Sequence, residues 1–326
     1  MTARGFIWCP HCSSPHPLGT TACPSTQKAL DSAIHAKKET SHPLVGTTLS
    51  GKYRVLRLLG SGGVGEVFGA ENIALRRNVA IKVLRVTSPD AVARLQREAQ
   101  LLASLNHPNI CGVYDVAAMP DGSPFLVLEW LVGVTLATRL KRSGPLTGEA
   151  TRHVFTQILS GVGAAHAAHI VHRDMKPENV ILLEAAAATD RPFVKIMDFG
   201  FAKDLSGNHG VTLTQKGHAV GTPEYMAPEQ LSGGRADART DIFAIGIMLY
   251  EALCGTHPFA ASSRVEVQTN ILRATAAQLR PVKGDVPPRV ADVVARALEK
   301  VPERRFTTAN EMQAALAQSF GAQAPR

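Results

Sequence analysis

Two short stretches of this chain decide its fold, and they read His172-Arg173-Asp174-Met175-Lys176-Pro177-Glu178-Asn179 and Asp198-Phe199-Gly200. Together they place a carboxylate, an ammonium, an amide and a second carboxylate on two loops that a fold can bring together. Asp174 can accept a proton from an incoming hydroxyl group, and Lys176 can steady a phosphate in transfer. Asn179 and Asp198 supply the hard oxygen ligands that Mg²⁺ prefers. The pattern therefore predicts phosphoryl transfer, which depends mainly on positioning and on screening of charge.

A glycine-rich stretch lies well before these loops, and it reads Gly60-Ser61-Gly62-Gly63-Val64-Gly65-Glu66-Val67. It stands between two strand-like runs, 53–59 and 66–71. A Rossmann turn would instead lie between a strand and a helix, so this context argues against a Rossmann turn. The glycines allow the tip of a hairpin to lie close over phosphates, with backbone N–H groups facing them.

Lys82 ends the run Val79-Ala80-Ile81-Lys82, a strand whose other residues favour burial. An ammonium in such a strand requires anionic partners. Residues 90–105 carry apolar side chains at helical spacing, and Glu98 lies in the middle of that helix. Glu98 alone fits a solvated helix face, paired with Arg94 one turn earlier. With Lys82 nearby, we expect a Lys82–Glu98 ion pair that holds the α- and β-phosphates of a nucleotide.

These motifs together resemble the eukaryotic-like serine/threonine protein kinases of bacteria. The resemblance covers about residues 53–320. It implies an α+β bilobal fold, with a small β-rich N-lobe (53–130) and a larger helical C-lobe (131–320). It also implies transfer of the γ-phosphate of Mg-ATP, with Mn²⁺ able to replace Mg²⁺, to Ser or Thr hydroxyls of proteins.

The resemblance gives roles to individual residues. Leu128 takes the gatekeeper position, and the backbones of Glu129 and Leu131 face adenine. The expected nucleotide-binding residues are Gly60, Ser61, Gly62, Gly63, Gly65, Val67, Ala80, Lys82, Glu129, Leu131 and Ile181. The expected catalytic residues are Asp174, Lys176, Lys82 and Glu98, and the Mg²⁺ ligands are Asn179 and Asp198.

Control of the activity is expected near the catalytic carboxylate. In the family, an Arg at the position of Arg173 marks kinases whose activation segment is ordered by a phosphate. Lys203 matches a second cation of that pocket. Thr212 and Thr214 are predicted autophosphorylation sites, so the chain itself is one expected substrate. Thr222 is predicted to contact the catalytic residues and to shape the substrate pocket.

Three further residues match structural positions of the family. Glu229, in Ala227-Pro228-Glu229, is expected to form a buried ion pair with Arg305, 76 residues away. Asp241 is expected to brace the backbone of His172 and Arg173, although a helix N-cap explains it equally well. Lys176 followed by Pro177 is typical of serine/threonine kinases rather than tyrosine kinases.

The N-terminal residues 1–28 are rich in Cys, His and Pro, and they resemble a degenerate zinc ribbon. Cys9, Cys12 and Cys23 are candidate Zn²⁺ ligands, with His11 or His16 as the fourth. Free thiols are the alternative. Residues 29–50 are predicted to be a linker, and residues 321–326 a tail.

The pattern of apolar side chains predicts the other elements of the body. Further strands are expected at 78–85, 111–117 and 125–129. Helices are expected at 148–168, 240–254, 289–300 and 308–320. The last of these is predicted to begin with a capping box formed by Thr308 and Glu311.

Composition limits the remaining possibilities. The net charge is +8, but no run of Lys and Arg exceeds two residues, so we expect no nucleic-acid partner. No apolar stretch is long enough to span a membrane, and the N-terminus lacks a signal-peptide pattern. Five cysteines fit a reducing compartment, and we expect a cytoplasmic protein.

Two other classes of function remain open at this point. A small-molecule kinase of the same broad fold usually lacks the Ala-Pro-Glu and Gly-Thr-Pro-x-Tyr segments, which this chain has. A non-catalytic pseudokinase lacks one or more of the chemical residues, and in this chain all of those positions are filled.

Overall fold

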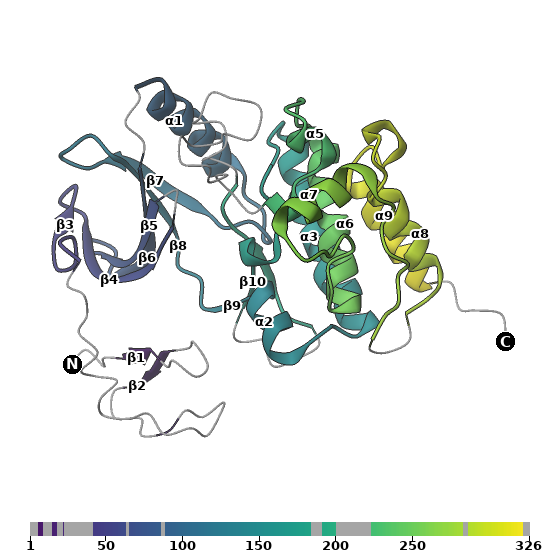
Figure 1. Cartoon of the computed structure of the whole chain (residues 1–326). Coiled ribbons are helices and arrows are strands. Elements are labelled where there is room, and N and C mark those ends of the chain that lie inside the picture. Colours follow the sequence, from purple (N-terminus) through teal and green to yellow (C-terminus); the bar gives the residue numbers. More distant parts are fainter. Residues whose placement is uncertain are drawn as a thin grey trace.

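The computed structural model describes residues 42–62, 65–85, 89–183, 191–199, 223–282 and 286–321, together with the short pieces 6–8, 15–17 and Ala22. The main part forms a sheet-rich lobe beside a helical lobe (Figure 1). The bilobal α+β fold expected from the motifs is therefore confirmed. Nearer the N-terminus, β1 (Phe6–Trp8) and β2 (Pro15–Pro17) form a separate antiparallel pair.

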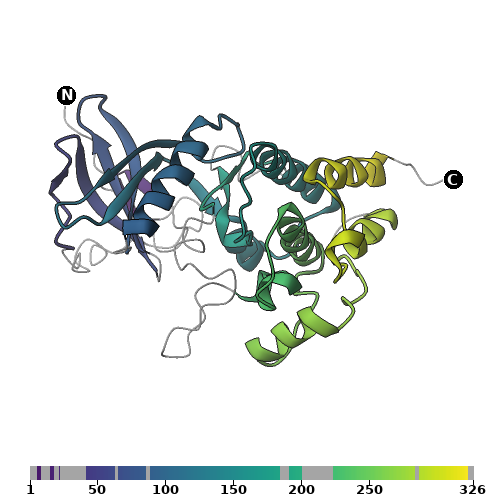
Figure 2. The same ribbon diagram turned by 90° about the horizontal axis from the view of Figure 1, so that it is seen from above.

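The N-lobe contains an antiparallel six-stranded sheet with the order β3-β4-β5-β6-β8-β7. Its strands are β3 (Thr48–Leu49), β4 (Tyr53–Ser61), β5 (Gly65–Asn72), β6 (Arg77–Leu84), β7 (Val113–Ala118) and β8 (Pro124–Glu129). Each of the three predicted N-terminal strands appears within two residues of its predicted bounds. Helix α1 (Pro89–Ser104) lies across one face of the sheet (Figure 2).

Both faces of this sheet are buried. Neighbouring side chains of a strand point to opposite faces. Phe125 of β8 therefore packs with Phe68 in a core on one face, and Leu126 packs with Leu95 of α1 on the other. All four side chains are fully buried, and their burial fixes the register of β8.

Residues 42–50, the described end of the predicted linker 29–50, pack on the N-lobe. Leu49 is 5 % exposed, and β3 pairs with β4. Leu44 and Val45 pack against the N-lobe core, and Gly46 N–H donates to Val55 O at 2.9 Å. The segment carries few large apolar side chains, so no pattern in the sequence indicated this packing.

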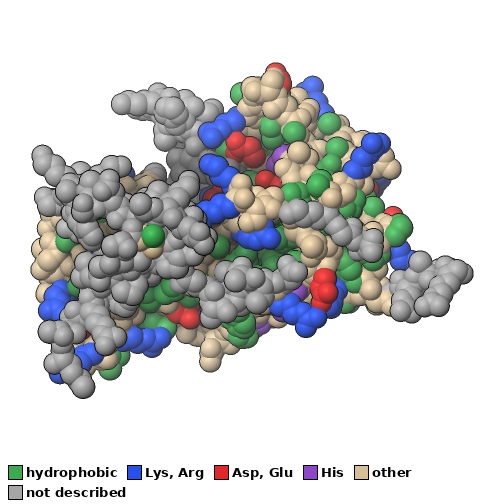
Figure 3. Space-filling model, turned by 90° about the horizontal axis from the view of Figure 1, so that it is seen from below, with side chains coloured by type: hydrophobic (Ala, Val, Ile, Leu, Met, Phe, Trp, Pro, Cys, Tyr) green, Lys and Arg blue, Asp and Glu red, His purple; other side chains and the backbone are tan. Residues whose placement is uncertain are grey.

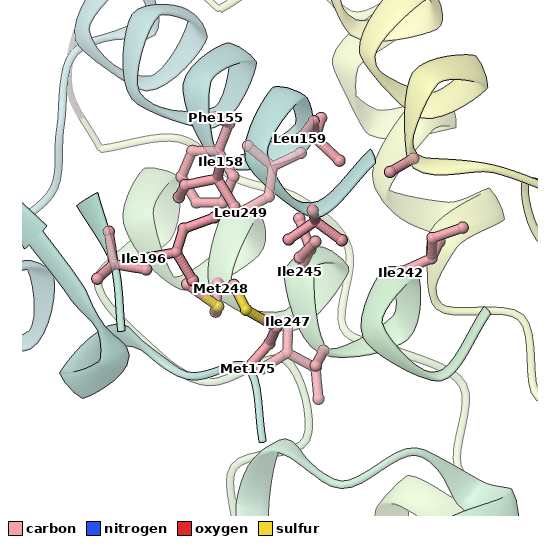
Figure 4. Close-up of a cluster of buried hydrophobic side chains, with 14 of the residues drawn as sticks. Phe155, Ile158, Leu159, Met175, Ile196, Ile242, Ile245, Ile247, Met248 and Leu249 are labelled. Atoms are coloured by element: carbon pink, nitrogen blue, oxygen red, sulfur yellow. The ribbon is translucent and has the colours of Figure 1, made fainter. Parts of the chain in front are cut away.

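The C-lobe consists mainly of helices: α2 (Leu136–Ser143), α3 (Gly148–Ala167), α5 (Pro228–Leu231), α6 (Ala238–Cys254), α7 (Arg264–Arg273), α8 (Arg289–Ala297) and α9 (Ala309–Gly321), with 3₁₀ turns η2 (Pro177–Asn179), η4 (Pro223–Tyr225) and η5 (Pro302–Arg304). Helices α3 and α6 pack against each other. Figure 4 shows Phe155 and Ile158 of α3 directed toward Leu249 of α6. None of the described helices is long and apolar enough to cross a membrane.

Helix α6 lies at the centre of this lobe. From Thr240 to Cys254 every residue except Glu251 is buried, which is typical of a helix covered on all sides. The helix begins at Asp237, whose side chain accepts the N–H of Arg239 at 2.8 Å. The N-cap is therefore Asp237, and Asp241 lies one turn inside the helix.

A small three-stranded sheet lies where the lobes meet, and it positions the catalytic residues. Its order is β11 (Val194–Ile196), β10 (Val180–Leu183), β9 (Gly133–Thr135). The loop before β10 contains residues 172–179, and the loop after β11 contains Asp198. Pairing of Val180 with Ile196 brings these loops together.

Candidate active site

The segment 172–179, called here the catalytic loop, is held in shape by its own polar groups. Lys176 Nζ donates to Asp174 Oδ2 at 2.8 Å. Asn179 Nδ2 donates to the backbone oxygen of Asp174 at 2.8 Å and to its Oδ2 at 3.3 Å. Because Nδ2 is directed to Asp174, Oδ1 is the atom of Asn179 left for a metal ion.

Lys82 meets Asp198 across the cleft between the lobes. Lys82 Nζ lies 2.7 Å from Asp198 Oδ1, and the Lys82 side chain is only 12 % exposed. Among the described residues, the ammonium of Lys82 pairs with Asp198, and the ion pair between Lys82 and Glu98 stays a prediction. Glu98 lies within helix α1, as predicted, and its side chain is half-buried.

Two residues of the site have backbone conformations that side chains usually avoid. The φ angles are +63° at Arg173 and +55° at Asp198. Such left-handed conformations are uncommon for residues other than glycine, and they cluster at functional sites. The surrounding hydrogen bonds therefore have to hold both residues in place.

Asp241 supplies several of these hydrogen bonds. Its Oδ1 accepts the N–H of Arg173 at 2.8 Å, and its Oδ2 accepts the N–H of His172 at 2.8 Å. His166 Nε2 lies 2.8 Å from the same Oδ2. The expected brace is thereby confirmed, and the alternative that Asp241 is an N-cap is excluded. No motif in the sequence indicated the contribution of His166.

The environment of Asp241 keeps it ionised. Burial alone would raise the pKa of Asp241, but the hydrogen bond and charge of His166 and the N–H of His172 lower it overall. A carboxyl group with a lowered pKa stabilises the fold at pH values above its unfolded pKa of about 3.9. That stabilisation disappears as the pH falls through the folded pKa.

The substitution Asp241→Asn is expected to lower kcat by about tenfold to a hundredfold. An amide has one acceptor oxygen, so one of the three donors would face an NH₂ group and the catalytic loop would shift. Steady-state kinetics of phosphate transfer measure this effect. Asp292→Asn, at an exposed carboxylate of α8, is the matched control. A wild-type kcat in Asp241→Asn would show that the loop does not depend on this brace.

His172 connects the catalytic loop to the segment that contains Asp198. Its Nε2 lies 2.8 Å from Met197 O, and its Nδ1 accepts the N–H of Asp174 at 3.3 Å. Burial lowers the pKa of His172, although nearby carboxylates oppose this. The ring also packs on Phe199, with centroids 4.6 Å apart. A neutral His172 therefore fixes the two loops relative to each other.

A largely apolar cavity of about 820 Å³, including space open to solvent, adjoins these loops. Val67 and Ala80 line it from the N-lobe, and Ile181 lines it from the C-lobe. Its other lining residues include Leu59, Lys82, Leu128, Glu129, Trp130, Leu131 and Asp198. A cavity of this size with a few polar groups suits a small organic ligand. The apolar residues predicted to enclose the adenine ring thus lie around one space.

The strand end at Glu129 is linked to β11 by an ion pair that no motif in the sequence indicated. Lys195 Nζ lies 2.7 Å from Glu129 Oε2 and donates to Ile110 O at 3.2 Å. The same Oε2 accepts the N–H of Gly112 at 3.1 Å. Glu129 N–H itself donates to Gly112 O at 2.8 Å. Lys195 and Gly112 therefore hold Glu129 in place at the part of the cavity that is expected to face adenine.

The glycine-rich stretch forms the tip of a hairpin between β4 and β5, called here the Gly-rich hairpin. Gly60 pairs with Val67, and Ser61 pairs with Glu66. At the tip, Gly62 N–H donates to Gly65 O at 2.9 Å. A Cβ atom at Gly65 would lie 2.1 Å from Val83 O, so only glycine fits there. The hairpin predicted between two strands is therefore confirmed.

The predicted ion pair between Glu229 and Arg305 is also confirmed. Arg305 Nη1 donates to Glu229 Oε1 at 2.8 Å, and Arg305 Nη2 donates to Glu229 Oε2 at 2.8 Å. The next residue, Gln230, donates from Nε2 to Arg173 O at 3.0 Å. Helix α5 thus connects the buried ion pair to the catalytic loop, a connection that no sequence motif indicated.

Several predicted residues lie outside the described residues: Gly63, Lys203, Thr212, Thr214, Thr222, Cys9, Cys12 and Cys23. Within the part of the chain that the structure covers, no three His, Cys, Asp or Glu residues form a metal-binding group. The zinc prediction therefore gains no support. Mg²⁺ does not require such a group, since it is usually bound by one or two carboxylates together with phosphates and water. Asn179 and Asp198 fit that requirement.

Charged side chains are dispersed on the face shown in Figure 3. Lys and Arg side chains lie in small groups there, with acidic side chains beside several of them. An extended basic surface that follows a nucleic-acid backbone would require a continuous row of such groups.

Comparisons with known proteins agree with the geometry. Residues 53–320 match the family model described as "Protein kinase domain". Serine/threonine-protein kinase PrkC of Bacillus subtilis is 36 % identical over 282 residues, which is 86 % of this chain and 42 % of that protein. Kinase pkn3 of Myxococcus xanthus is 39 % identical over 278 residues, 83 % of this chain and 50 % of that protein. PknB of Mycolicibacterium smegmatis is 38 % identical over 283 residues, 85 % of this chain and 44 % of that protein. The chain spans half or less of the length of these relatives.

Proposed function

Because this chain belongs to the protein kinase domain family, we propose that it transfers the γ-phosphate of ATP to Ser and Thr hydroxyls of proteins. The observation that carries the proposal is the convergence of Asp174, Lys176 and Asn179 with Lys82 and Asp198 beside one apolar cavity. The names of the similar bacterial proteins support the choice of Ser and Thr.

The adenine ring would occupy the cavity between Val67 and Ala80 above and Ile181 below. The backbone N–H of Leu131 makes no hydrogen bond to the described residues, so it is available to the ring. Lys82 would bind the phosphates. Asn179 Oδ1 and Asp198 would hold Mg²⁺, which screens charge on the phosphates.

The transfer step requires a proton acceptor beside the incoming hydroxyl group. A bond forms between the hydroxyl oxygen and the γ-phosphorus, and the bond from that phosphorus to the β–γ bridging oxygen breaks. The hydroxyl proton passes to Asp174, and ADP leaves. Lys176, 2.8 Å from Asp174 Oδ2, is placed to neutralise charge on the phosphoryl group in transit.

Regulation by autophosphorylation is part of the proposal. Thr212 and Thr214 are the proposed sites, and the cations proposed to bind their phosphates are Arg173 and Lys203. Lys203 and both Thr residues lie outside the described residues, so this part depends on the resemblance alone. The cytoplasm is the proposed location.

Incubation of the purified chain with γ-labelled ATP and Mg²⁺ tests the proposal. We expect label on the chain itself, mapped by mass spectrometry to Thr212 or Thr214, and no label when EDTA removes the metal. Label that appears equally in EDTA would contradict the metal-dependent mechanism. Labelled protein without phosphate on 206–222 would overturn the regulatory part only.

A further inference from the structure

His42 lies outside the span that matches the kinase family model, yet it contacts the Gly-rich hairpin. Its Nε2 lies 3.2 Å from Glu66 Oε2, and its ring packs on Phe68 with centroids 4.8 Å apart. Its Nδ1 accepts the N–H of Leu44 at 3.3 Å. A nitrogen that accepts a hydrogen bond carries no proton, so the proton of the neutral ring is assigned to Nε2, which donates to Glu66.

The segment that contains His42 is fixed to the lobe. His42 O accepts the N–H of Val45 at 2.8 Å, which closes a turn. Thr47 O accepts the N–H of Val55 at 2.9 Å, so the segment continues the edge of β4. The His42 side chain is 22 % exposed. The imidazole is therefore held by Leu44 at Nδ1 and by Glu66 at Nε2.

Glu66 and Phe68 lie on the face of β5 opposite to the nucleotide cavity. Side chains alternate along a strand, and Val67 between them lines the cavity. His42 thus contacts the hairpin from its far side. Arg85 also contacts the hairpin. Its Nη2 lies 3.3 Å from Glu66 Oε1, and its Nη1 lies 3.5 Å from Gly62 O.

We propose that His42 is a positioning residue for ATP, and that it acts through Glu66. The hydrogen bond from His42 restrains Glu66, which directly follows Gly65 at the tip of the Gly-rich hairpin. Arg85 extends this restraint to the backbone of Gly62. A restrained hairpin loses less conformational freedom when it closes over phosphates, so ATP binds more tightly. The inference rests on the proposed function, because it requires the hairpin to bind ATP.

Three variants of the full chain separate the hydrogen bond from the packing. His42→Phe keeps a ring against Phe68 but cannot donate to Glu66, whereas His42→Gln keeps an N–H donor. We expect His42→Phe to weaken ATP binding by about threefold to tenfold, the equivalent of one hydrogen bond, with kcat unchanged. His42→Gln should restore most of the affinity. Thr47→Ala, which removes an exposed hydroxyl of the same segment, is the matched control.

Titration of each variant with a fluorescent ATP analogue, together with the KM for ATP and kcat, provides the readout. Addition of His42→Phe to Glu66→Ala should weaken binding no further than Glu66→Ala alone, because His42 acts through the Glu66 side chain. Equal ATP affinity of His42→Phe and the wild type would overturn the inference. A double variant whose loss of ATP affinity equals the product of the two single losses would overturn it too. If the wild-type chain itself fails to bind ATP, the proposed function fails instead, so the two failures are distinguishable.

Discussion

Replacement of Asp174 by Asn is expected to lower the rate of phosphate transfer by about 10²–10⁴-fold while ATP affinity stays at the wild-type value. The amide oxygen keeps a hydrogen bond from Lys176, so the catalytic loop retains its shape. It cannot accept the hydroxyl proton, because an amide is a much weaker base than a carboxylate. Asp174 does not line the cavity proposed for adenine, so nucleotide binding should be unaffected.

Single-turnover kinetics with labelled ATP measure the chemical step, and a fluorescent ATP analogue measures the affinity. Asp121→Asn is the matched control, because this substitution removes an exposed carboxylate in the turn between β7 and β8. Full activity of Asp174→Asn would show that the base is another residue. Loss of ATP binding would show that Asp174 acts on the nucleotide rather than on the acceptor hydroxyl.

Replacement of Arg305 by Met is expected to destabilise the fold by about 3–5 kcal/mol, the cost of leaving a buried charge without its partner. Arg305 is 2 % exposed, and it donates two hydrogen bonds to Glu229. It also donates to the backbone oxygens of Glu299, Arg239 and Lys300 at 2.7 to 3.1 Å. The substitution removes all of these bonds at once.

Urea denaturation followed by circular dichroism measures the free energy of unfolding. Arg296→Met is the matched control, since Arg296 forms an ion pair with Glu311 in which both side chains are more than a third exposed. That substitution should cost about 1 kcal/mol or less. The double variant Arg305→Met with Glu229→Leu should recover much of the lost stability, because neither charge remains. Equal costs for Arg305→Met and Arg296→Met would contradict the role given to the buried pair.

The elements that the sequence predicted well are those with a long, regular pattern. The helix predicted at 148–168 is found at 148–167, and the strand at 125–129 is found at 124–129. Helices α2, α5 and α7 and strands β9, β10 and β11 were not predicted. The three strands have only three or four residues each, too few to show an alternation, and the polar face of α7 obscures its few buried positions.

One predicted cap formed only in part. The N–H of Glu311 donates to Thr308 Oγ1 at 3.1 Å, as a capping box requires. The Glu311 carboxylate, however, accepts the N–H of Thr307 at 2.7 Å instead of that of Thr308. The sequence shows which residues can pair, but the path of the chain before the helix selects the donor.

At the site, too, the motifs show which groups are present but not which of them pair. They contain the groups needed for transfer, but not the partner of Lys82, because Asp198 and Glu98 are both anionic and lie far apart in the sequence. His166, Lys195 and His42 belong to no motif, and each acts through a neighbour from another element. Such positioning residues are found only when the fold is known.

The most direct measurement uses a phosphatase-treated cell lysate, γ-labelled ATP and Mg²⁺, with the wild-type chain and Asp174→Asn in parallel. We predict that the wild type labels proteins, that mapped sites are Ser and Thr, and that Asp174→Asn adds almost no label. Label confined to small molecules, label on Tyr, or equal labelling by both proteins would contradict the assignment as a serine/threonine protein kinase.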